Sequence, residues 1–196
     1  MKWPLYFILS IFVCCPSCQL NQEGERTAYI QLFLEDHDDW IQQGDANWAF
    51  EEGELIGKSD SSAGFVITKA SFDEFQLKLE FKPDSTINSG IYIQCRSEVM
   101  DAISCREINI WDLHPNQSFR TGALVGMAEP LKVVHTIGKW NTYKIIAKNH
   151  RIQAWVNQQQ TLDVVDSSFT KGTIALQAAG SGQIRFRQVE LSLVED

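Results

Sequence analysis

The chain has 196 residues, a length typical of one domain with a short additional segment. Apolar residues make up 44% of the chain and charged residues 21%, which excludes a disordered chain and a membrane protein with many spans. The net charge is −8 and no cluster of Lys and Arg occurs, which argues against a nucleic-acid partner.

The first 17 residues have the pattern of a secretory signal peptide. Lys2 precedes an apolar run of roughly a dozen residues, which is shorter than the about 20 that a membrane-spanning helix needs. Cys18 directly follows Ser17, as at bacterial lipoprotein processing sites; Cys15 is a second candidate, and ordinary secretion is the alternative. We therefore predict a signal peptide over 1–17, lipidation at Cys18 and a tether over 18–26. The protein would be exported to the bacterial cell envelope, with the lipid as its only membrane contact.

The cysteine count predicts one disulfide. Of the five cysteines, Cys14 and Cys15 would leave with the signal peptide and Cys18 would carry the lipid. An exported protein folds in an oxidising compartment, so the remaining pair, Cys95 and Cys105, is expected to be bonded. A zinc site is the alternative, but no pair of histidines lies near these two cysteines.

Alternation of apolar and polar residues recurs along the rest of the chain, and helical periodicity is nearly absent. Turn residues separate thirteen predicted strands, over 29–34, 47–51, 54–57, 64–68, 75–82, 90–96, 105–112, 123–126, 140–148, 151–157, 160–165, 173–177 and 183–194. Many short strands without intervening helices predict an all-β fold of antiparallel sheets packed face to face. We expect one jelly-roll β-sandwich domain over 27–196.

Three of these strands present a polar and aromatic face. The polar and aromatic side chains are Tyr92, Gln94 and Arg96 in one strand, Glu107, Asn109 and Trp111 in the next, and Arg151, Gln153, Trp155 and Asn157 in the third. Aromatic side chains stack on the apolar faces of sugars, so such a surface is typical of a sugar-binding cleft. An ordinary solvated face with a few large residues is the alternative.

The segment 105–126 holds the densest set of chemically useful residues. Glu107, Asp112, His114 and Arg120 supply a carboxylate, an imidazole and a guanidinium, which suit proton transfer and charge stabilisation. Each also has a structural interpretation: Asp112 can close a turn around Pro115, Arg120 can pair with Asp112, and His114 can be a solvated loop residue. Glu107 lies in mid-strand between isoleucines, where a covered carboxylate needs a partner.

Six segments resemble the 3-keto-disaccharide hydrolase domain family, which was long catalogued as a domain of unknown function. They are NSGIYIQCR (88–96), CREINIWDLHPNQSFRTGALV (105–125), GKWNTYKIIAK (138–148), WVN (155–157), GTIALQ (172–177) and IRFRQVEL (184–191). The resemblance covers about residues 29–194. It implies a concanavalin A-like lectin/glucanase sandwich, exported and often lipid-anchored.

The resemblance also implies functional positions. The family positions that match are Asn88, Ser89, Gly90, Glu107, Asp112, Thr121, Gly122, Trp140, Asn141 and Gln177. The chain departs from the family pattern in the segment 34–37 before Trp40. It also departs at Ala178 and Ala179, where members often carry a polar residue.

The implied activity is cleavage of glycosides whose sugar carries a ketone at C3. Such a ketone acidifies the C2 hydrogen, so a base can remove that proton, the C1 substituent can leave, and water can then add. In this scheme Glu107 is the base, Arg96 or Arg120 stabilises the charge, and His114 or Asp112 is the acid. Substrate contacts are expected from the polar and aromatic residues, namely Tyr92, Gln94, Arg96, Asn109, Trp111, Trp155 and Gln177.

Two other function classes stay open. A non-catalytic glycan-binding module needs only the aromatic face, with Glu107 as a hydrogen-bond acceptor. A glucanase-like glycosidase needs paired carboxylates, but the second position on the face of Glu107 is Asn109. No metal-ligand spacing occurs, so we predict no cofactor, and bound Ca²⁺ is left open. We expect a carbohydrate as the partner, and the sequence does not indicate the oligomeric state.

Overall fold

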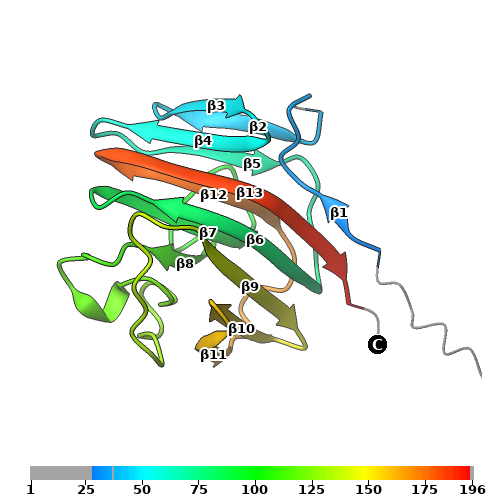
Figure 1. The fold of residues 1–196 in the computed structure, drawn as a ribbon. Helices are drawn as coiled ribbons and strands as arrows, with labels where there is room; N and C mark the ends of the chain where they lie inside the picture. Colours follow the sequence, from blue (N-terminus) through cyan, green and yellow to red (C-terminus); the bar gives the residue numbers. More distant parts are fainter. Residues whose placement is uncertain (1–27, 37, 195–196) are drawn as a thin grey trace, which may run out of the picture.

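The computed structural model describes residues 28–36 and 38–194. The predicted signal peptide, Cys18 and the tether over 18–26 lie outside the described residues. The described part forms two antiparallel sheets that pack face to face (Figure 1). The predicted all-β sandwich is therefore confirmed.

The larger sheet contains eight strands. Its order is β11 (Gln159–Val165), β10 (Arg151–Val156), β9 (Asn141–Lys148), β6 (Phe75–Pro83), β13 (Gly182–Leu193), β4 (Glu54–Ser59) and β3 (Asn47–Glu51), and the short β1 (Ile30–Gln31) pairs with β13. In Figure 1, β6 and β13 run side by side through the middle of this sheet.

The smaller sheet contains five strands and carries the candidate site. Its order is β2 (Trp40–Gly44), β5 (Gly64–Thr68), β12 (Thr173–Gly180), β7 (Ile87–Cys95) and β8 (Arg106–Ile110). The chain crosses between the sheets from β4 to β5 and again from β6 to β7. Strands that are neighbours in the sequence therefore often belong to different layers.

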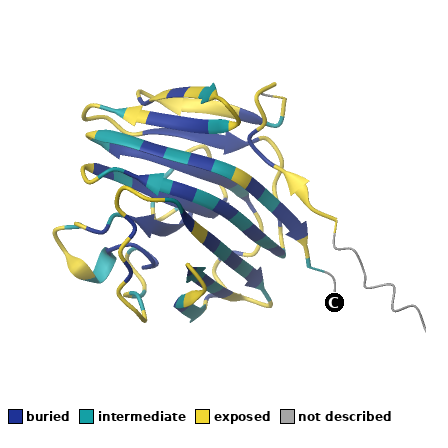
Figure 2. Cartoon of the chain, viewed as in Figure 1, coloured by how far each residue is buried: buried dark blue, intermediate teal, exposed yellow. Residues whose placement is uncertain are grey.

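The core lies between the two sheets. In β6 buried and half-buried residues alternate without a break, and Figure 2 shows the same banding along β6 and β13. From the smaller sheet, Val66, Leu176, Ile91 and Ile108 are fully buried in this core. Because side chains alternate along a strand, the residues between them point to the outer face of the smaller sheet.

The structure differs from the predicted elements in three places. The strand predicted over 29–34 is limited to β1, Ile30–Gln31. Residues 40–44 form β2, which the sequence pattern did not reveal because only Trp40 of the strand is buried, its indole N–H donating to the carbonyl of Leu34 at 2.7 Å. The predicted strand over 123–126 is absent. Leu124 instead makes isolated bridges to Ile108 and Ala128, because the chain turns back after Gly126, which has φ +76°.

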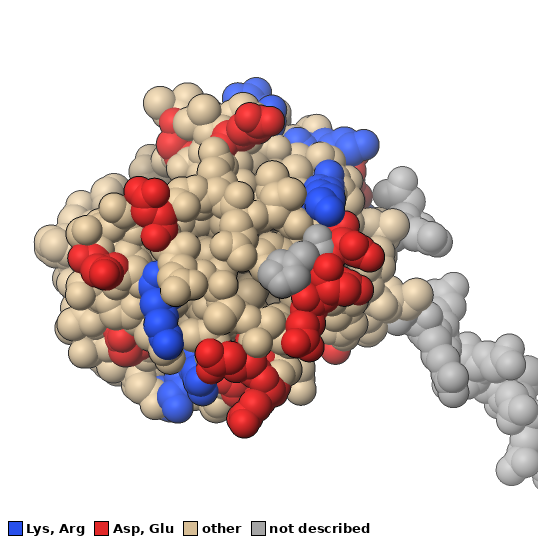
Figure 3. All heavy atoms as spheres, turned by 90° about the horizontal axis from the view of Figure 1, so that it is seen from above, with Lys and Arg blue, Asp and Glu red and all other residues tan. Residues whose placement is uncertain are grey.

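The charged side chains form no basic stripe on the face seen in Figure 3. Basic groups lie singly or in small groups there, beside more numerous acidic ones. Within 28–36 and 38–194, no helix is long and apolar enough to cross a membrane.

Cys95 and Cys105 form a disulfide, as predicted. The bond joins the end of β7 to the residue before β8 and closes the loop 96–104. Both cysteines are buried, and Met100 from the loop packs against the same apolar cluster.

Opening this bond should destabilise the fold without changing its architecture. A closed loop of this length stabilises a protein by about 2–3 kcal/mol, chiefly by restricting the unfolded chain. We expect the free energy of unfolding of the Cys95→Ala/Cys105→Ala variant, measured by equilibrium urea unfolding, to be lower than that of the wild type by at least this amount. The reduced wild type, which keeps both side chains, is the matched control. A loss below about 0.5 kcal/mol in both would contradict the expectation.

Candidate functional site

The outer face of the smaller sheet arranges its side chains in two rows. Strand pairing places Ile41, Ile67, Ala175, Tyr92 and Glu107 in one row. The second row is formed by Gln43, Phe65, Gln177, Gly90 and Asn109. Glu107 therefore lies at the end of the first row, on β8, directly opposite Tyr92 of β7.

Gly90 provides the space for the Glu107 carboxylate. A Cβ atom at position 90 would lie 3.1 Å from Oε1 and 3.2 Å from Cγ of Glu107, closer than most such contacts. The side chain of Glu107 therefore lies across β7 over the glycine. This close approach explains why a glycine suits position 90, which is one of the family positions.

Three side chains form a hydrogen-bonded chain at this place. The amide Nε2 of Gln177 donates to the Tyr92 hydroxyl at 3.0 Å, and that hydroxyl donates to the Glu107 carboxylate. Gln177 thus orients the hydroxyl proton toward Glu107. The Oε1 atom of Gln177 is buried and accepts no hydrogen bond from the residues that the structure describes. A bound hydroxyl group would satisfy it.

Burial dominates the electrostatics of this group. Desolvation raises the pKa of the Glu107 carboxyl from 4.5 to about 7, and the hydrogen bond from Tyr92 acts in the opposite direction. Burial and the neighbouring Glu107 raise the pKa of the Tyr92 phenol far above its ordinary value, so it stays a donor. The site therefore holds a carboxyl that exchanges its proton near neutral pH.

Asp112 has a different environment. One carboxylate oxygen accepts from the hydroxyls of Thr121 at 2.6 Å and Thr136 at 2.9 Å, and the other accepts from the Thr136 backbone N–H at 2.6 Å. All three residues are buried. Asp112 thus joins the segment that contains Thr121 to the segment that contains Thr136. Its role as the acid stays a prediction.

Arg120 and His114 lie in the loop after β8. Arg120 is buried and donates to Gln117 at 3.0 Å and to the carbonyl of Val134 at 2.8 Å, so it does not pair with Asp112. The ring of His114 is half-buried, with its Nδ1 next to Asn116 and its edge against Trp111, 4.5 Å between ring centroids.

The free edge of β8 is covered by residues 122–125. The N–H and carbonyl of Asn109 bond to Ala123 and Gly122, and the carbonyl of Glu107 accepts from Val125, each at 3.0 Å. The Asn109 side chain donates to the carbonyl of Phe119. Asn109 therefore holds the covering segment in place and is itself buried.

A backbone irregularity separates Gln94 from the face on which the sequence placed it. Gln94 has φ +53°, and the pairing of β12 with β7 shifts register between Thr173 and Ala175. Cys95 rather than Gln94 therefore shares an apolar cluster with Tyr92. The Gln94 amide instead donates to the carbonyl of Thr170 at 3.4 Å.

Trp155 does not join the site. It lies on β10 of the larger sheet, where its strand neighbours Ala154 and Val156 face the core and the ammonium of Lys144 lies 4.4 Å from its ring centroid. Its side chain therefore points away from the smaller sheet. The alternation was correct, but it could not tell which sheet the strand joins.

A groove lies on the same outer face, toward the side of the sheet formed by β2 and β5. It has a volume of about 490 Å³ and is lined by residues of β2 and β5, the end of β7 and the loop 96–100, including Ile41, Ile67, Arg96 and Met100. We call it the β2–β7 groove. The guanidinium of Arg96, at its rim, stacks on the ring of Phe169, 3.8 Å from the centroid. Sequence reasoning missed the groove because β2 was not predicted.

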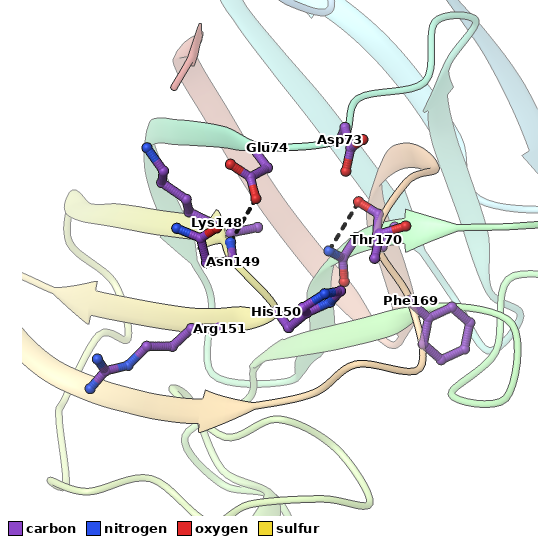
Figure 4. A pocket seen from close by; sticks show the side chains of 10 residues that line it. Asp73, Glu74, Lys148, Asn149, His150, Arg151, Phe169 and Thr170 are labelled. Atoms are coloured by element: carbon purple, nitrogen blue, oxygen red, sulfur yellow. Dashed lines mark hydrogen bonds between the residues drawn. The ribbon is translucent and has the colours of Figure 1, made fainter. Parts of the chain in front are cut away.

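A second pocket lies at the turn between β9 and β10. Figure 4 shows Glu74, His150 and Phe169 around it, and its volume of about 30 Å³ suits water rather than a sugar. Within the ranges 28–36 and 38–194, no group of three or more His, Cys, Asp and Glu side chains could hold a metal ion. The absence of a cofactor stays a prediction.

The comparisons with known proteins agree with this architecture. A family model described as "3-keto-alpha-glucoside-1,2-lyase-like domain" matches residues 28–192. No curated protein matches the chain significantly.

Solved structures share the fold. A presumed glycosyl hydrolase from Parabacteroides distasonis is 22% identical with a TM-score of 0.70, covering 85% of this chain and 100% of that one. The carbohydrate-binding module CBM66 from Bacillus subtilis is 18% identical with a TM-score of 0.62, covering 79% and 95%. A Bacillus subtilis protein with a galectin-like fold is 14% identical with a TM-score of 0.57, covering 85% and 98%. These matches confirm the predicted concanavalin A-like lectin type of sandwich.

Protonation of Glu107 should make the stability depend on pH. Its pKa in the folded protein lies above its ordinary value, so the folded protein binds more protons between about pH 4.5 and 7. The stability it contributes is fully present below this window and is lost as the pH rises through about 7. Between these pH values, the free energy of unfolding of the wild type should fall by up to about 1.4 kcal/mol per pH unit relative to that of Glu107→Gln.

Urea unfolding at pH 5, 6, 7 and 8 measures this difference. Glu51→Gln, at an exposed position of β3, is the matched control for the substitution itself. Tyr92→Phe removes the donor to the carboxylate and should move the midpoint to higher pH. Parallel stability curves for the wild type and Glu107→Gln would show that the carboxyl does not titrate in this window.

Proposed function

The chain belongs to the 3-keto-alpha-glucoside-1,2-lyase-like domain family, and on this premise we propose that it cleaves glycosidic bonds of 3-keto sugars with Glu107 as the base. The observation that carries the proposal is the buried Glu107 carboxyl on the outer face of the smaller sheet, opposite Tyr92, where burial raises its pKa to about 7. A general base works best when its pKa lies near the operating pH.

The reaction needs one group of the protein that accepts a proton from the sugar. Glu107 takes the C2 proton, and the electron pair of that bond delocalises onto the C3 ketone oxygen as an enolate. The enolate then collapses, a double bond forms between C1 and C2, and the C1–O bond breaks with protonation of the leaving oxygen. Addition of water across the double bond, OH to C1 and H to C2, completes a net hydrolysis.

The hydrogen bonds favour Glu107 over Asp112 as the base. The carboxylate oxygens of Asp112 accept three hydrogen bonds from Thr121 and Thr136, whereas Glu107 receives one from Tyr92. The donors that surround Asp112 already occupy its oxygens, which leaves them less available to a substrate proton. Arg96, at the rim of the β2–β7 groove, is the proposed stabiliser of the enolate charge, and His114 is the proposed acid.

A carbohydrate-binding module without catalysis is the second candidate. The observation that favours it is the Gln177–Tyr92 pair, which could bind sugar hydroxyls with no bond cleavage. Incubating the protein with a 3-keto-α-glucoside and with its unoxidised parent separates the candidates. Cleavage of the ketone alone supports the proposal, binding without turnover supports the module, and cleavage of the parent supports a glucanase-like enzyme.

We also propose that the protein is exported and anchored by lipid at Cys18. The apolar run before Ser17 supports this, and so does the Cys95–Cys105 disulfide, because such bonds persist in oxidising compartments.

Cys18→Ser should release the protein from the membrane fraction in a cell fractionation experiment, because the thiol that carries the lipid is lost. Cys15→Ser is the matched control and should stay membrane-bound. The reverse outcome would move the lipidation site to Cys15.

Glu107→Gln should lower the rate of 3-keto-glucoside cleavage by about 10²–10⁴-fold, the usual contribution of a positioned base. The amide keeps the shape, can still accept from Tyr92 and avoids the cost of burying a carboxylate, so at pH 6 the variant should melt no lower than the wild type. Glu51→Gln is the control for the loss of a carboxylate elsewhere. Unchanged turnover per folded molecule in Glu107→Gln would refute the assignment.

A further inference from the structure

The Tyr92 hydroxyl lies at the carboxylate that would take the substrate proton. Tyr92 and Glu107 are direct strand partners on β7 and β8, and the hydroxyl donates to the carboxylate. The amide Nε2 of Gln177 donates to the hydroxyl oxygen at 3.0 Å, and the rings of Phe65 and Tyr92 meet edge to face with 5.4 Å between their centroids. The phenol is therefore fixed by its ring and by both of its hydrogen bonds.

The side chains around this pair have other partners. Gly90, over which the Glu107 carboxylate lies, has no side chain, and the Asn109 amide donates to a backbone carbonyl. The guanidinium of Arg96 is stacked on an aromatic ring, 3.8 Å from its centroid. Tyr92 is therefore the donor that meets the reacting carboxylate directly.

The proposed reaction moves a negative charge by a short distance. The charge is on Glu107 at first, and it moves to the C3 ketone oxygen when Glu107 takes the C2 proton. C2 and C3 are bonded to each other, so the enolate oxygen forms close to the carboxylate. Glu107 is 9% and Tyr92 is 4% exposed, so the protein rather than bulk water surrounds this charge. A developing oxyanion in such a place needs a donor from the protein.

A hydrogen bond from the phenol can follow this charge. Hydrogen bonds to ionised acceptors are about twice as strong as those between neutral groups, so the hydroxyl gains by exchanging a protonated carboxyl for an enolate oxygen. Burial raises the pKa of the Tyr92 phenol far above its ordinary value, so the phenol keeps its own proton. The Gln177 N–H acts on this pKa in the opposite direction, because it stabilises negative charge on the phenol oxygen, and this strengthens the phenol as a donor.

We propose that Tyr92 is a catalytic residue that donates its hydrogen bond to the enolate oxygen, and that Gln177 is its positioning residue. The proposal rests on the proposed function. The C2–H bond breaks, its proton passes to Glu107, and its electron pair moves to the C3 oxygen, while the O–H bond of Tyr92 stays intact. A neutral donor at the carboxylate thus stabilises the charge for which Arg96, at the rim of the β2–β7 groove, is the other candidate.

The pH dependence of Tyr92→Phe separates this role from an effect on the base alone. Loss of the hydroxyl should raise the pKa of Glu107, so a hydroxyl that only adjusts the base would matter at low pH and not at high pH, where Glu107 is ionised. A donor to the enolate is missed at every pH. We therefore expect the limiting kcat/KM at high pH to fall by about 10²–10³-fold, the usual effect of losing one oxyanion donor.

Enolate formation is measured separately from bond cleavage. The 3-keto derivative of 1,5-anhydroglucitol has no group to leave from C1, so exchange of its C2 hydrogen for deuterium, followed by NMR, reports proton transfer alone. Tyr92→Phe should slow this exchange by a similar factor. Gln177→Met should slow exchange and cleavage about tenfold in the wild type, with no further loss in the Tyr92→Phe background. Tyr29→Phe, which removes an exposed hydroxyl beside Lys78 of the larger sheet, is the matched control.

Rates are expressed per folded molecule, from the circular dichroism of each variant. A wild-type limiting rate in Tyr92→Phe, or a loss that disappears at high pH, refutes the catalytic role of Tyr92 and leaves the proposed function intact. An equal loss in Gln177→Met with and without the Tyr92 hydroxyl refutes the positioning role of Gln177. A wild type that neither cleaves a 3-keto-α-glucoside nor exchanges the C2 hydrogen overturns the proposed function, and the role of Tyr92 with it.

Discussion

A carboxyl group held out of water on the face of a sheet is the constraint around which the site is built. Taking a carboxylate out of water is costly unless donors meet it, and the donor that meets Glu107 is the Tyr92 hydroxyl. Gln177 fixes that hydroxyl, and Gly90 leaves the space in which the carboxylate lies. The incomplete compensation keeps the proton exchangeable near neutrality, which a fully paired carboxylate would not allow.

The family positions separate into two groups with different physical roles. Gly90, Glu107 and Gln177 surround the exchangeable carboxyl. A second group fastens loops: Asp112 joins Thr121 to Thr136, and the Asn141 amide donates to the carbonyls of Thr136 and Lys139. Glu107 is therefore the candidate proton acceptor, whereas Asp112 holds loops together, although the two lie five residues apart in the same segment of the sequence.

Local periodicity predicted most strands and the face of Glu107, because alternation along β7 and β8 depends on nearby residues. The prediction failed where a backbone irregularity or the pairing of distant strands determines on which face a side chain lies. The positive φ of Gln94 ends the alternation in β7 and turns this side chain away from Tyr92. Trp155 has the expected alternation but belongs to the other sheet, and strand partners far apart in the sequence cannot be read from one strand. The β2–β7 groove depends on β2, whose mostly exposed residues carry no apolar pattern.

The segment 122–125 also has a consequence for the behaviour of the protein in solution. An uncovered strand at a sheet border is a template for intermolecular pairing, and here the border groups of Glu107 and Asn109 are already bonded to Gly122, Ala123 and Val125. A homologue that shortened this excursion would expose the backbone of β8. Self-association into extended sheets, rather than a simple loss of turnover, would then be the first defect to emerge. The loop thus protects solubility at the same strand that carries the chemistry.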